Sequence, residues 1–304
     1  MWKLEIWELY IKGIILAGGR GTRLRPVTSV VVKQLLPIYD KPMIYYPLAT
    51  LMSAQIRDIA IICNPKDIDL FQNLLGDGSQ IGIRLTYIIQ NEPRGIAEAF
   101  ILAQDFISKS AVALILGDNL FHGPGLGRNL QQFAHIEGAQ VFAYHVNNPE
   151  EYGVISFNTD GVPISIEEKP TEPSSNFAIP GLYFFDNQVV GFAAELNPSK
   201  RGELEITDIM KTYLRKKILS ASLISRGAVW LDTGTVDSLQ AASVYIQVIE
   251  QRQGFKIGCI EEIAFNNGWI SENDIRLAIK QYGDCSYAEY LQSFIKVNTR
   301  NWIF

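Results

Sequence analysis

The sequence predicts an α/β fold in which a mostly parallel mixed sheet is covered by helices. Short apolar runs alternate with segments of helical periodicity through the first half of the chain, and these runs are nearly continuous, as in strands buried on both faces. Because this alternation is typical of Rossmann-like sheets, we expect the functional site beyond the carboxyl ends of the strands. The predicted strands cover residues 13–17, 58–63, 83–90, 111–116 and 140–146, and the predicted helices cover residues 44–55, 66–75, 96–107 and 126–137.

The pattern changes after residue 147. Two runs, 153–157 and 162–167, flank the Asp160-Gly161 turn and predict a hairpin. A further strand is predicted at 179–185 and helices at 205–217 and 235–253, the last opened by Thr233 or Thr235 and stopped by Gly254. We therefore predict an N-terminal extension (1–11), one α/β domain (12–254) with a small β excursion, and a C-terminal helical appendage (255–304).

Charge and cysteine content limit the class of partner. The 304 residues carry a net charge of −5, so a broad surface for nucleic acid or for an anionic membrane is not expected. No run approaches the roughly 18 apolar residues of a membrane span. The three cysteines include no C-x-x-C pair, which indicates neither a disulfide framework nor a zinc site, and we expect a cytoplasmic protein.

A glycine loop follows the first predicted strand directly. Residues 16–26 are Leu-Ala-Gly-Gly-Arg-Gly-Thr-Arg-Leu-Arg-Pro. Three glycines allow the backbone to approach a ligand closely and three arginines favour an anion, which predicts a phosphate site. Two common phosphate loops do not fit, because the chain has no Gly-Lys dipeptide and Leu24 stands where G-x-G-x-x-G needs its last glycine.

Longer motifs carry a family resemblance. The glycine loop followed by Lys-Gln-Leu-Leu-Pro at 33–37 resembles the signature of the sugar-1-phosphate nucleotidylyltransferases. Residues 33–47, 74–79, 143–147, 201–208 and 230–234 are similar to the members that transfer a thymidylyl group, and the resemblance runs from about residue 12 to about residue 270. It implies that dTTP and glucose 1-phosphate give dTDP-glucose and pyrophosphate with Mg²⁺, a place in dTDP-rhamnose biosynthesis, and a homotetramer with a feedback site at an interface.

The implied reaction needs cations more than it needs a base. The attacking sugar phosphate is already an anion, since the second pKa of a phosphate monoester is near 6. The barrier is the repulsion between two anions that must meet in line. The resemblance implies Arg23 and Lys33 as catalytic residues at the triphosphate and Lys169 at the sugar phosphate. It also places Asp118 and Asp232 on Mg²⁺, for which carboxylate oxygens are suitable ligands.

The resemblance further implies contacts with the base and the sugar. The positions that match contacts to the base are Gln34, Gln90 and Gly95, and those around the glucose ring are Tyr152, Gly153, Glu168 and Tyr183. The remaining implied substrate-binding residues are Gly18, Gly19, Gly21, Thr22 and Asn119.

Three positions depart from the family pattern and leave the nucleotide preference open: Val32, Arg94 and Pro180. One alternative is the same transfer with another nucleotide, such as UTP, or another sugar phosphate. A second is an inactive ligand-binding regulator. A third is a nucleotide-sugar glycosyltransferase, which is disfavoured because such an enzyme is not expected to carry the glycine loop.

Overall fold

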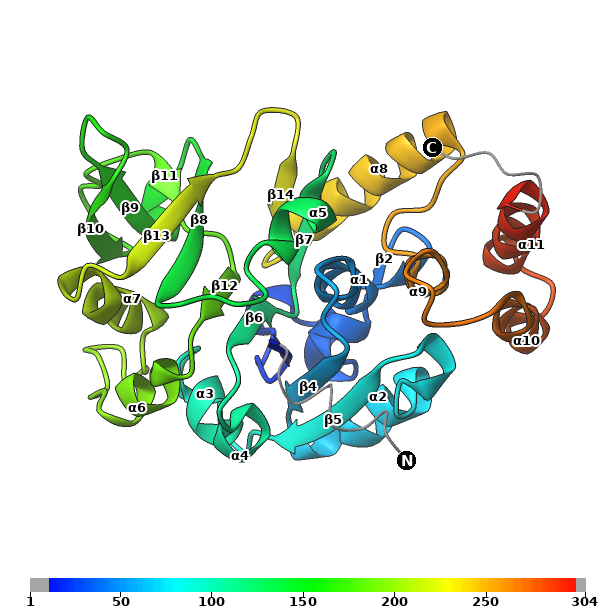
Figure 1. Ribbon diagram of the computed structural model, residues 1–304, viewed down its shortest axis with the longest axis horizontal. Coiled ribbons are helices and arrows are strands. Elements are labelled where there is room, and N and C mark those ends of the chain that lie inside the picture. Colours follow the sequence, from blue (N-terminus) through cyan, green and yellow to red (C-terminus); the bar gives the residue numbers. More distant parts are fainter. Residues whose placement is uncertain (1–10, 299–304) are drawn as a thin grey trace.

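The structure of the chain, a computed structural model, describes residues 11–298 (Figure 1). The predicted N-terminal extension lies outside the described residues except for its last residue. A sheet of 10 strands forms the centre, in the order β10-β9-β11-β8-β12-β6-β1-β4-β5, with β13 paired to β8. These strands are β1 (Lys12–Leu16), β4 (Asp58–Cys63), β5 (Arg84–Ile89), β6 (Val112–Leu116), β8 (Ala139–His145), β9 (Gly153–Phe157), β10 (Pro163–Glu168), β11 (Phe177–Ala178), β12 (Leu182–Phe185) and β13 (Leu219–Leu223).

The predicted α/β fold is confirmed. Strands β5, β4, β1 and β6 are parallel neighbours, and β12 pairs antiparallel with both β6 and β8. The antiparallel strands β9, β10 and β11 extend the sheet at one end, which Figure 1 shows on the left. Strands β4 and β9 have the predicted bounds, whereas β13, which is parallel to β8, was not predicted.

Side chains of successive strand residues enter two different cores. Ile15 and Ile61 belong to the core on the face of α1 (Tyr45–Ser53), α2 (Ile68–Leu75) and α5 (Leu126–Gln131). Ile14 and Ile62 belong to the core on the opposite face. Burying one such side chain fully contributes about 1.5–3 kcal/mol relative to leaving it exposed. The helices of the second face are α3 (Glu98–Leu102), α4 (Gln104–Ile107), α6 (Gln188–Ala194) and α7 (Ile206–Arg215).

Some predicted bounds were wrong. Residues 96–107 form two short helices, α3 and α4, because the chain leaves the α-helical region at Ala103. The strand predicted at 179–185 begins only at Leu182, after Pro180, whose ring nitrogen cannot donate to a ladder. Several short elements were not predicted: the 3-10 helices Thr22–Leu24, Val27–Ser29, Lys33–Leu35, Pro65–Asp67, Ser79–Ile81 and Pro149–Glu151, and the strands β2 (Pro37–Ile38) and β3 (Lys41–Pro42).

A two-stranded ladder stands apart from the main sheet. It joins β7 (Asn119–His122) to β14 (Val229–Asp232) in antiparallel register. Helix α8 (Val236–Gln253) follows β14 and begins at Thr235, whose side chain accepts a hydrogen bond from the Ser238 N–H, and it ends at Gly254 with a φ of 73°. This cap decides between the two predicted start residues.

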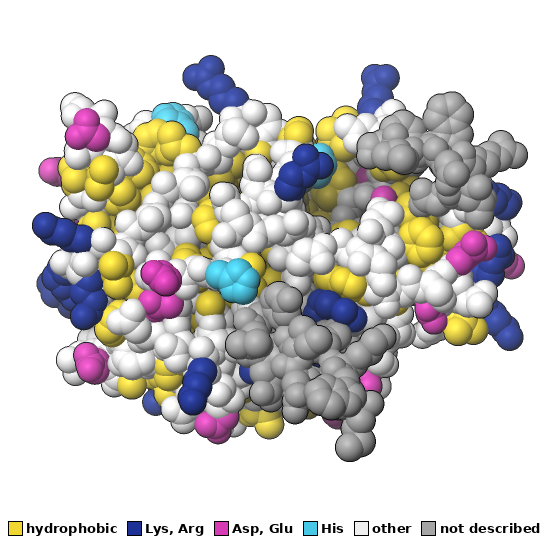
Figure 2. Space-filling model, in the orientation of Figure 1, with side chains coloured by type: hydrophobic (Ala, Val, Ile, Leu, Met, Phe, Trp, Pro, Cys, Tyr) yellow, Lys and Arg dark blue, Asp and Glu magenta, His cyan; other side chains and the backbone are white. Residues whose placement is uncertain are grey.

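Three helices follow α8 and lie at the right of Figure 1: α9 (Ile260–Asn266), α10 (Glu272–Tyr282) and α11 (Ser286–Asn298). Cys259, Ile275, Tyr287, Leu291 and Ile295 form a small core among them. On the described part of the face in Figure 2, Lys and Arg side chains are interspersed with Asp and Glu side chains. Within residues 11–298, no helix is long and apolar enough to cross a bilayer.

We predict that His122 makes stability depend on pH. Its Nδ1 lies 2.7 Å from the Tyr245 hydroxyl, which connects β7 to α8, and burial lowers its pKa. The unfolded chain therefore takes up this proton first as the pH falls below about 6.5, which favours unfolding until the folded pKa is passed. Urea titrations at pH 7.5 and 5.0 should show a smaller loss of unfolding free energy in His122→Gln than in the unmodified chain. Equal losses in the two proteins would contradict the prediction.

Candidate active site

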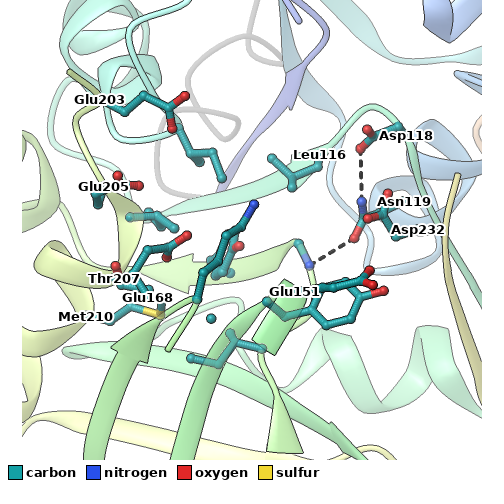
Figure 3. A pocket seen from close by; sticks show the side chains of 18 of the residues that line it. Leu116, Asp118, Asn119, Glu151, Glu168, Glu203, Glu205, Thr207, Met210 and Asp232 are labelled. Atoms are coloured by element: carbon teal, nitrogen blue, oxygen red, sulfur yellow. Dashed lines mark hydrogen bonds between the residues drawn. The ribbon is translucent and has the colours of Figure 1, made fainter. Parts of the chain in front are cut away.

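A cavity of about 270 Å³ opens where the sequence places most of the predicted site residues (Figure 3). It lies beyond the carboxyl end of β6, at the position expected for a sheet of this type. In Figure 3, Asp118, Asn119 and Asp232 form one group of polar side chains, and Glu168, Glu203 and Glu205 form another. Nine predicted residues line it: Arg23, Asp118, Asn119, Tyr152, Gly153, Glu168, Lys169, Tyr183 and Asp232.

The β7–β14 ladder brings the two predicted metal ligands together. Its register sets Asp232 opposite Asn119, the residue after Asp118. Thr233 then closes the end of the ladder, since its N–H and its hydroxyl donate to the Asp118 carbonyl oxygen at 3.2 and 2.8 Å. Two aspartates that are 114 positions apart by their numbers thus share one wall of the cavity.

Asn119 connects three elements around this wall. It is 3% exposed, and its Oδ1 accepts hydrogen bonds from the Gly181 N–H at 3.0 Å and from the Trp230 Nε1–H at 2.7 Å. Its Nδ2 donates to Asp118 Oδ1 at 3.0 Å. The Asn119 side chain therefore positions the Asp118 carboxylate in addition to lining the cavity.

Three cations surround the two carboxylates. Lys33 forms an ion pair with Asp118, and a Cβ on Gly234 would lie 2.9 Å from Arg23 Nη2 and 3.1 Å from Asp232 Oδ1. Burial, and then the charge of Asp118, raises the pKa of Asp232 to about 6, against the charges of Lys33, Arg23 and Lys169. The three predicted catalytic cations thus all interact with the Asp232 carboxylate.

The pair of carboxylates fits Mg²⁺. Among residues 11–298, no group of three or more His, Cys, Asp or Glu side chains could hold a metal ion. Mg²⁺ does not require one, because it usually takes one or two carboxylates and completes its shell with waters and phosphate oxygens. Burial and, after it, repulsion between the two carboxylates raise the pKa of Asp232, and a cation beside both carboxylates would relieve that repulsion.

The other end of the cavity is acidic. Burial and the charge of Glu205 raise the pKa of Glu168. Arg201 spans this end, with Nη2 at 2.8 Å from Glu205 Oε2, 3.0 Å from Glu203 Oε2 and 3.4 Å from Glu168 Oε1. Arg201 and Glu205 were not predicted as site residues, although both lie in the motif at 201–208. That motif was the signal that could have identified them.

Lys169 is held in an uncommon backbone conformation at the end of β10. Its φ is +43°, and its N–H donates to the Tyr152 carbonyl oxygen at 3.0 Å. A non-glycine residue at positive φ costs about 1–3 kcal/mol, which the surrounding structure must offset. Tyr152 is fixed in turn by Trp230, whose ring centroid lies 5.1 Å away. Tyr183 is buried beneath the cavity on β12.

The glycine loop lies beside a second cavity, of about 480 Å³. Gly21 adopts the left-handed conformation, with φ 58°, and its carbonyl oxygen accepts from the Thr28 hydroxyl at 2.7 Å. Thr22 is exposed and begins the short helix that follows Gly21. Positive side chains dominate the second cavity, which is lined by Gly19, Arg20, Arg25, Lys33 and Lys66 among others. Since Lys33 also binds Asp118, it joins the two cavities.

The predicted base-contacting residues lie outside both cavities. Gln34 and Gln90 are 3% and 2% exposed, and their Oε1 atoms have no hydrogen-bond partner in the described structure. Gly18 lies against Gln90, and the Asn64 side chain holds the Gly18 carbonyl oxygen at 3.1 Å. The structure thus places Gln90 next to Gly18, at the start of the glycine loop.

Gly95 has a packing role that the sequence did not show. Its φ is +108°, and a Cβ at this position would lie 2.3 Å from the Leu204 carbonyl oxygen. The two backbones are joined by hydrogen bonds from Leu204 N–H to the Arg94 oxygen at 2.7 Å and from Ala97 N–H to the Leu204 oxygen at 3.2 Å. The segment after Gln90 therefore packs on the loop that carries Arg201 and Glu205.

Comparison with known proteins shows extensive similarity. The family model described as nucleotidyl transferase matches residues 12–248. A glucose-1-phosphate thymidylyltransferase of Mycolicibacterium smegmatis is 52% identical over 281 residues, 92% of this chain and 98% of the relative. One of Neisseria gonorrhoeae is 51% identical over 286 residues, 94% of this chain and 99% of the relative. A Bacillus anthracis crystal structure with sucrose, assigned the same enzyme name, is 41% identical, covers 77% of this chain and 94% of its own, and has a TM-score of 0.72.

We predict that Gly95→Ala destabilises the fold more than Gly161→Ala. Both glycines have positive φ, but a Cβ on Gly161 would meet nothing within 4 Å, whereas one on Gly95 would collide with the Leu204 backbone. The cost should be about 1–2 kcal/mol at Gly161 for the left-handed conformation alone and about 3 kcal/mol or more at Gly95. Urea unfolding of the two variants measures the difference. Equal costs would show that the Leu204 contact is unimportant.

Proposed function

The chain belongs to the nucleotidyl transferase family and, within it, to the glucose-1-phosphate thymidylyltransferases, and we propose that it transfers the thymidylyl group of dTTP to glucose 1-phosphate. The products are dTDP-glucose and pyrophosphate. The single observation that supports the reaction best is the convergence of Arg23, Lys33 and Lys169 on the carboxylate pair at the end of β6.

The cations address the main barrier of this reaction. A sugar phosphate must approach the α-phosphorus of a triphosphate, and both are anions. Arg23 and Lys33 lie on the side of the glycine loop, where they neutralise the triphosphate and the departing pyrophosphate. Lys169 lies next to Glu168 at the sugar end, where it binds and orients the sugar phosphate. Electrostatic stabilisation and positioning then supply the catalysis, without a protein base.

The carboxylates complete the phosphate site. Asp118 and Asp232 would hold Mg²⁺, which when bound screens negative charge on the phosphates. Lys33 pairs with one oxygen of the Asp118 carboxylate, and Asn119 fixes the other.

The acidic end of the cavity suits a polyhydroxylated ligand. Glu168 presents a carboxylate acceptor for sugar hydroxyls. Arg201, which also pairs with Glu205, forms an ion pair with that carboxylate. The Tyr152 and Trp230 rings supply an apolar surface at the cavity wall. These features support a sugar phosphate as the second substrate.

Three wider assignments rest on the family resemblance: cytoplasmic location, supply of dTDP-rhamnose synthesis, and a homotetramer with an interfacial feedback site. For the assembly, the described surface offers one supporting feature. Helix α8 exposes Val236, Val244 and Val248, with exposed fractions of 53%, 48% and 50%, which a subunit contact would bury.

Pyrophosphate release tests the proposal directly. The purified protein should release pyrophosphate from dTTP and glucose 1-phosphate, and the release should stop when EDTA removes Mg²⁺. UTP, CTP, ATP and GTP are offered separately, and release should be strongest with dTTP. Strongest release with another nucleotide would reassign the substrate, and silence with all five would reject the enzyme in favour of a binding regulator or a different sugar phosphate.

Two variants test the catalytic assignments. We expect Arg23→Ala and Asp118→Ala each to lower kcat/KM by about 10²–10³-fold, because each removes charge at the reacting phosphates. Arg276→Ala is the control, since Arg276 is an exposed cation of α10 paired with Glu272. Thermal unfolding verifies that all three variants fold. Activity near that of the control in either test variant would remove that residue from the mechanism.

A further inference from the structure

The side-chain oxygen of Gln90 is buried and has no hydrogen-bond partner in the described structure. Gln90 follows β5 directly and is 2% exposed. Its Nε2 donates to Glu98 Oε2 at 2.8 Å, whereas its Oε1 accepts no hydrogen bond in the described structure. Leaving such an acceptor unpaired costs about 1–3 kcal/mol, so its retention points to a ligand donor.

Glu98 decides which way the Gln90 amide points. Glu98 is 2% exposed on α3, and Arg94 holds it from three atoms. The Arg94 backbone N–H lies 3.0 Å from Oε2, and Nε and Nη2 each lie 2.7 Å from Oε1. A carboxylate only accepts hydrogen bonds, so it requires the NH₂ group of Gln90 on its side. The Gln90 carbonyl oxygen is thereby turned away from Glu98.

The freed oxygen faces the glycine loop. A Cβ on Gly18 would lie 1.9 Å from Gln90 Oε1, so this oxygen packs against the backbone of Gly18. Gln34 is also buried and also has an unpaired Oε1. In the described part of the chain, however, no carboxylate contact is found that fixes the amide of Gln34. Gln90 is thus the acceptor of the two whose direction is fixed.

We propose that Glu98, clamped by Arg94, is a positioning residue that fixes Gln90 as an acceptor and so selects bases with a ring N–H. The inference rests on the proposed function and on the family resemblance, which implies that Gln90 contacts the nucleobase. Thymine and uracil carry an N–H at N3, which can donate to Gln90 Oε1. Cytosine has a lone pair at N3 instead, which would face the lone pairs of Oε1. Glu98 would therefore exclude cytosine without touching the base.

Arg94 binds the buried Glu98 carboxylate although its own side chain is mostly exposed. Its side chain is 67% exposed, and an exposed ion pair by itself contributes only about 0–1 kcal/mol. Its partner, however, is buried and charged, and a buried carboxylate needs donors on both oxygens. Arg94 supplies donors to both oxygens of Glu98, beside Gln90.

The test compares dTTP, dUTP and dCTP, which share a sugar and differ in the base. Glu98→Gln removes the acceptor-only partner and lets the Gln90 amide turn, so the kcat/KM ratio of dTTP to dCTP should fall by about 10-fold or more. Arg94→Ala should lower the same ratio by a smaller factor. The ratio of dTTP to dUTP should not change, because both bases carry the N3–H.

Arg276→Ala is the control, because Arg276 is about as exposed as Arg94 and also pairs with a Glu four positions away, whereas its partner Glu272 is not buried as Glu98 is. It should leave every ratio unchanged. If Glu98→Gln does not fold, Arg94→Ala decides the matter, since its side chain is mostly in solvent. The inference is overturned if the folded variants keep the dTTP to dCTP ratio of the parent, or lose both activities equally. Absence of pyrophosphate release in the parent protein with all three nucleotides would instead reject the proposed function.

Discussion

The antiparallel pairing of β7 with β14 is the constraint on which the site depends. It forces two aspartates into one wall of the cavity, where burial and mutual repulsion oppose the charge of Asp232. Such an arrangement persists only if cations and hydrogen-bond donors hold it. Lys33 pairs with Asp118, Asn119 fixes its other oxygen, and Thr233 closes the ladder. Cations and hydrogen-bond donors therefore hold the carboxylate pair in place against local electrostatic repulsion, an arrangement that suits the polyanion and the divalent cation that we propose.

The parallel half of the fold could be predicted from the sequence because burial on both faces leaves a continuous apolar run. Strands β7 and β14 could not be predicted, because each has only four residues and their pairing joins segments more than 100 positions apart. Helix α6 was also missed, and its short span of seven residues gives little periodicity to detect.

The candidate site follows the same division. Asp118 and Lys33, which the resemblance assigned to the metal and to the triphosphate, form an ion pair, because a family resemblance carries spatial information that periodicity lacks. Arg201 and Glu205 were quoted within a motif but given no role. Their relation to Glu168 arises from a loop that packs on Gly95, and that packing is a tertiary fact with no local signature.

The three departures from the family pattern are accommodated in ways that keep new charge out of the cavity. Val32 is 7% exposed and joins the apolar core beside α1, so its missing hydroxyl is replaced by packing. Pro180 accepts from the Leu182 N–H at 2.8 Å just before β12, where a ring nitrogen without a proton is tolerated. Arg94 places its charge on Glu98 and in solvent. Arg23, Lys33 and Lys169 still act on Asp232, so none of the three departures removes a cation from the aspartate pair.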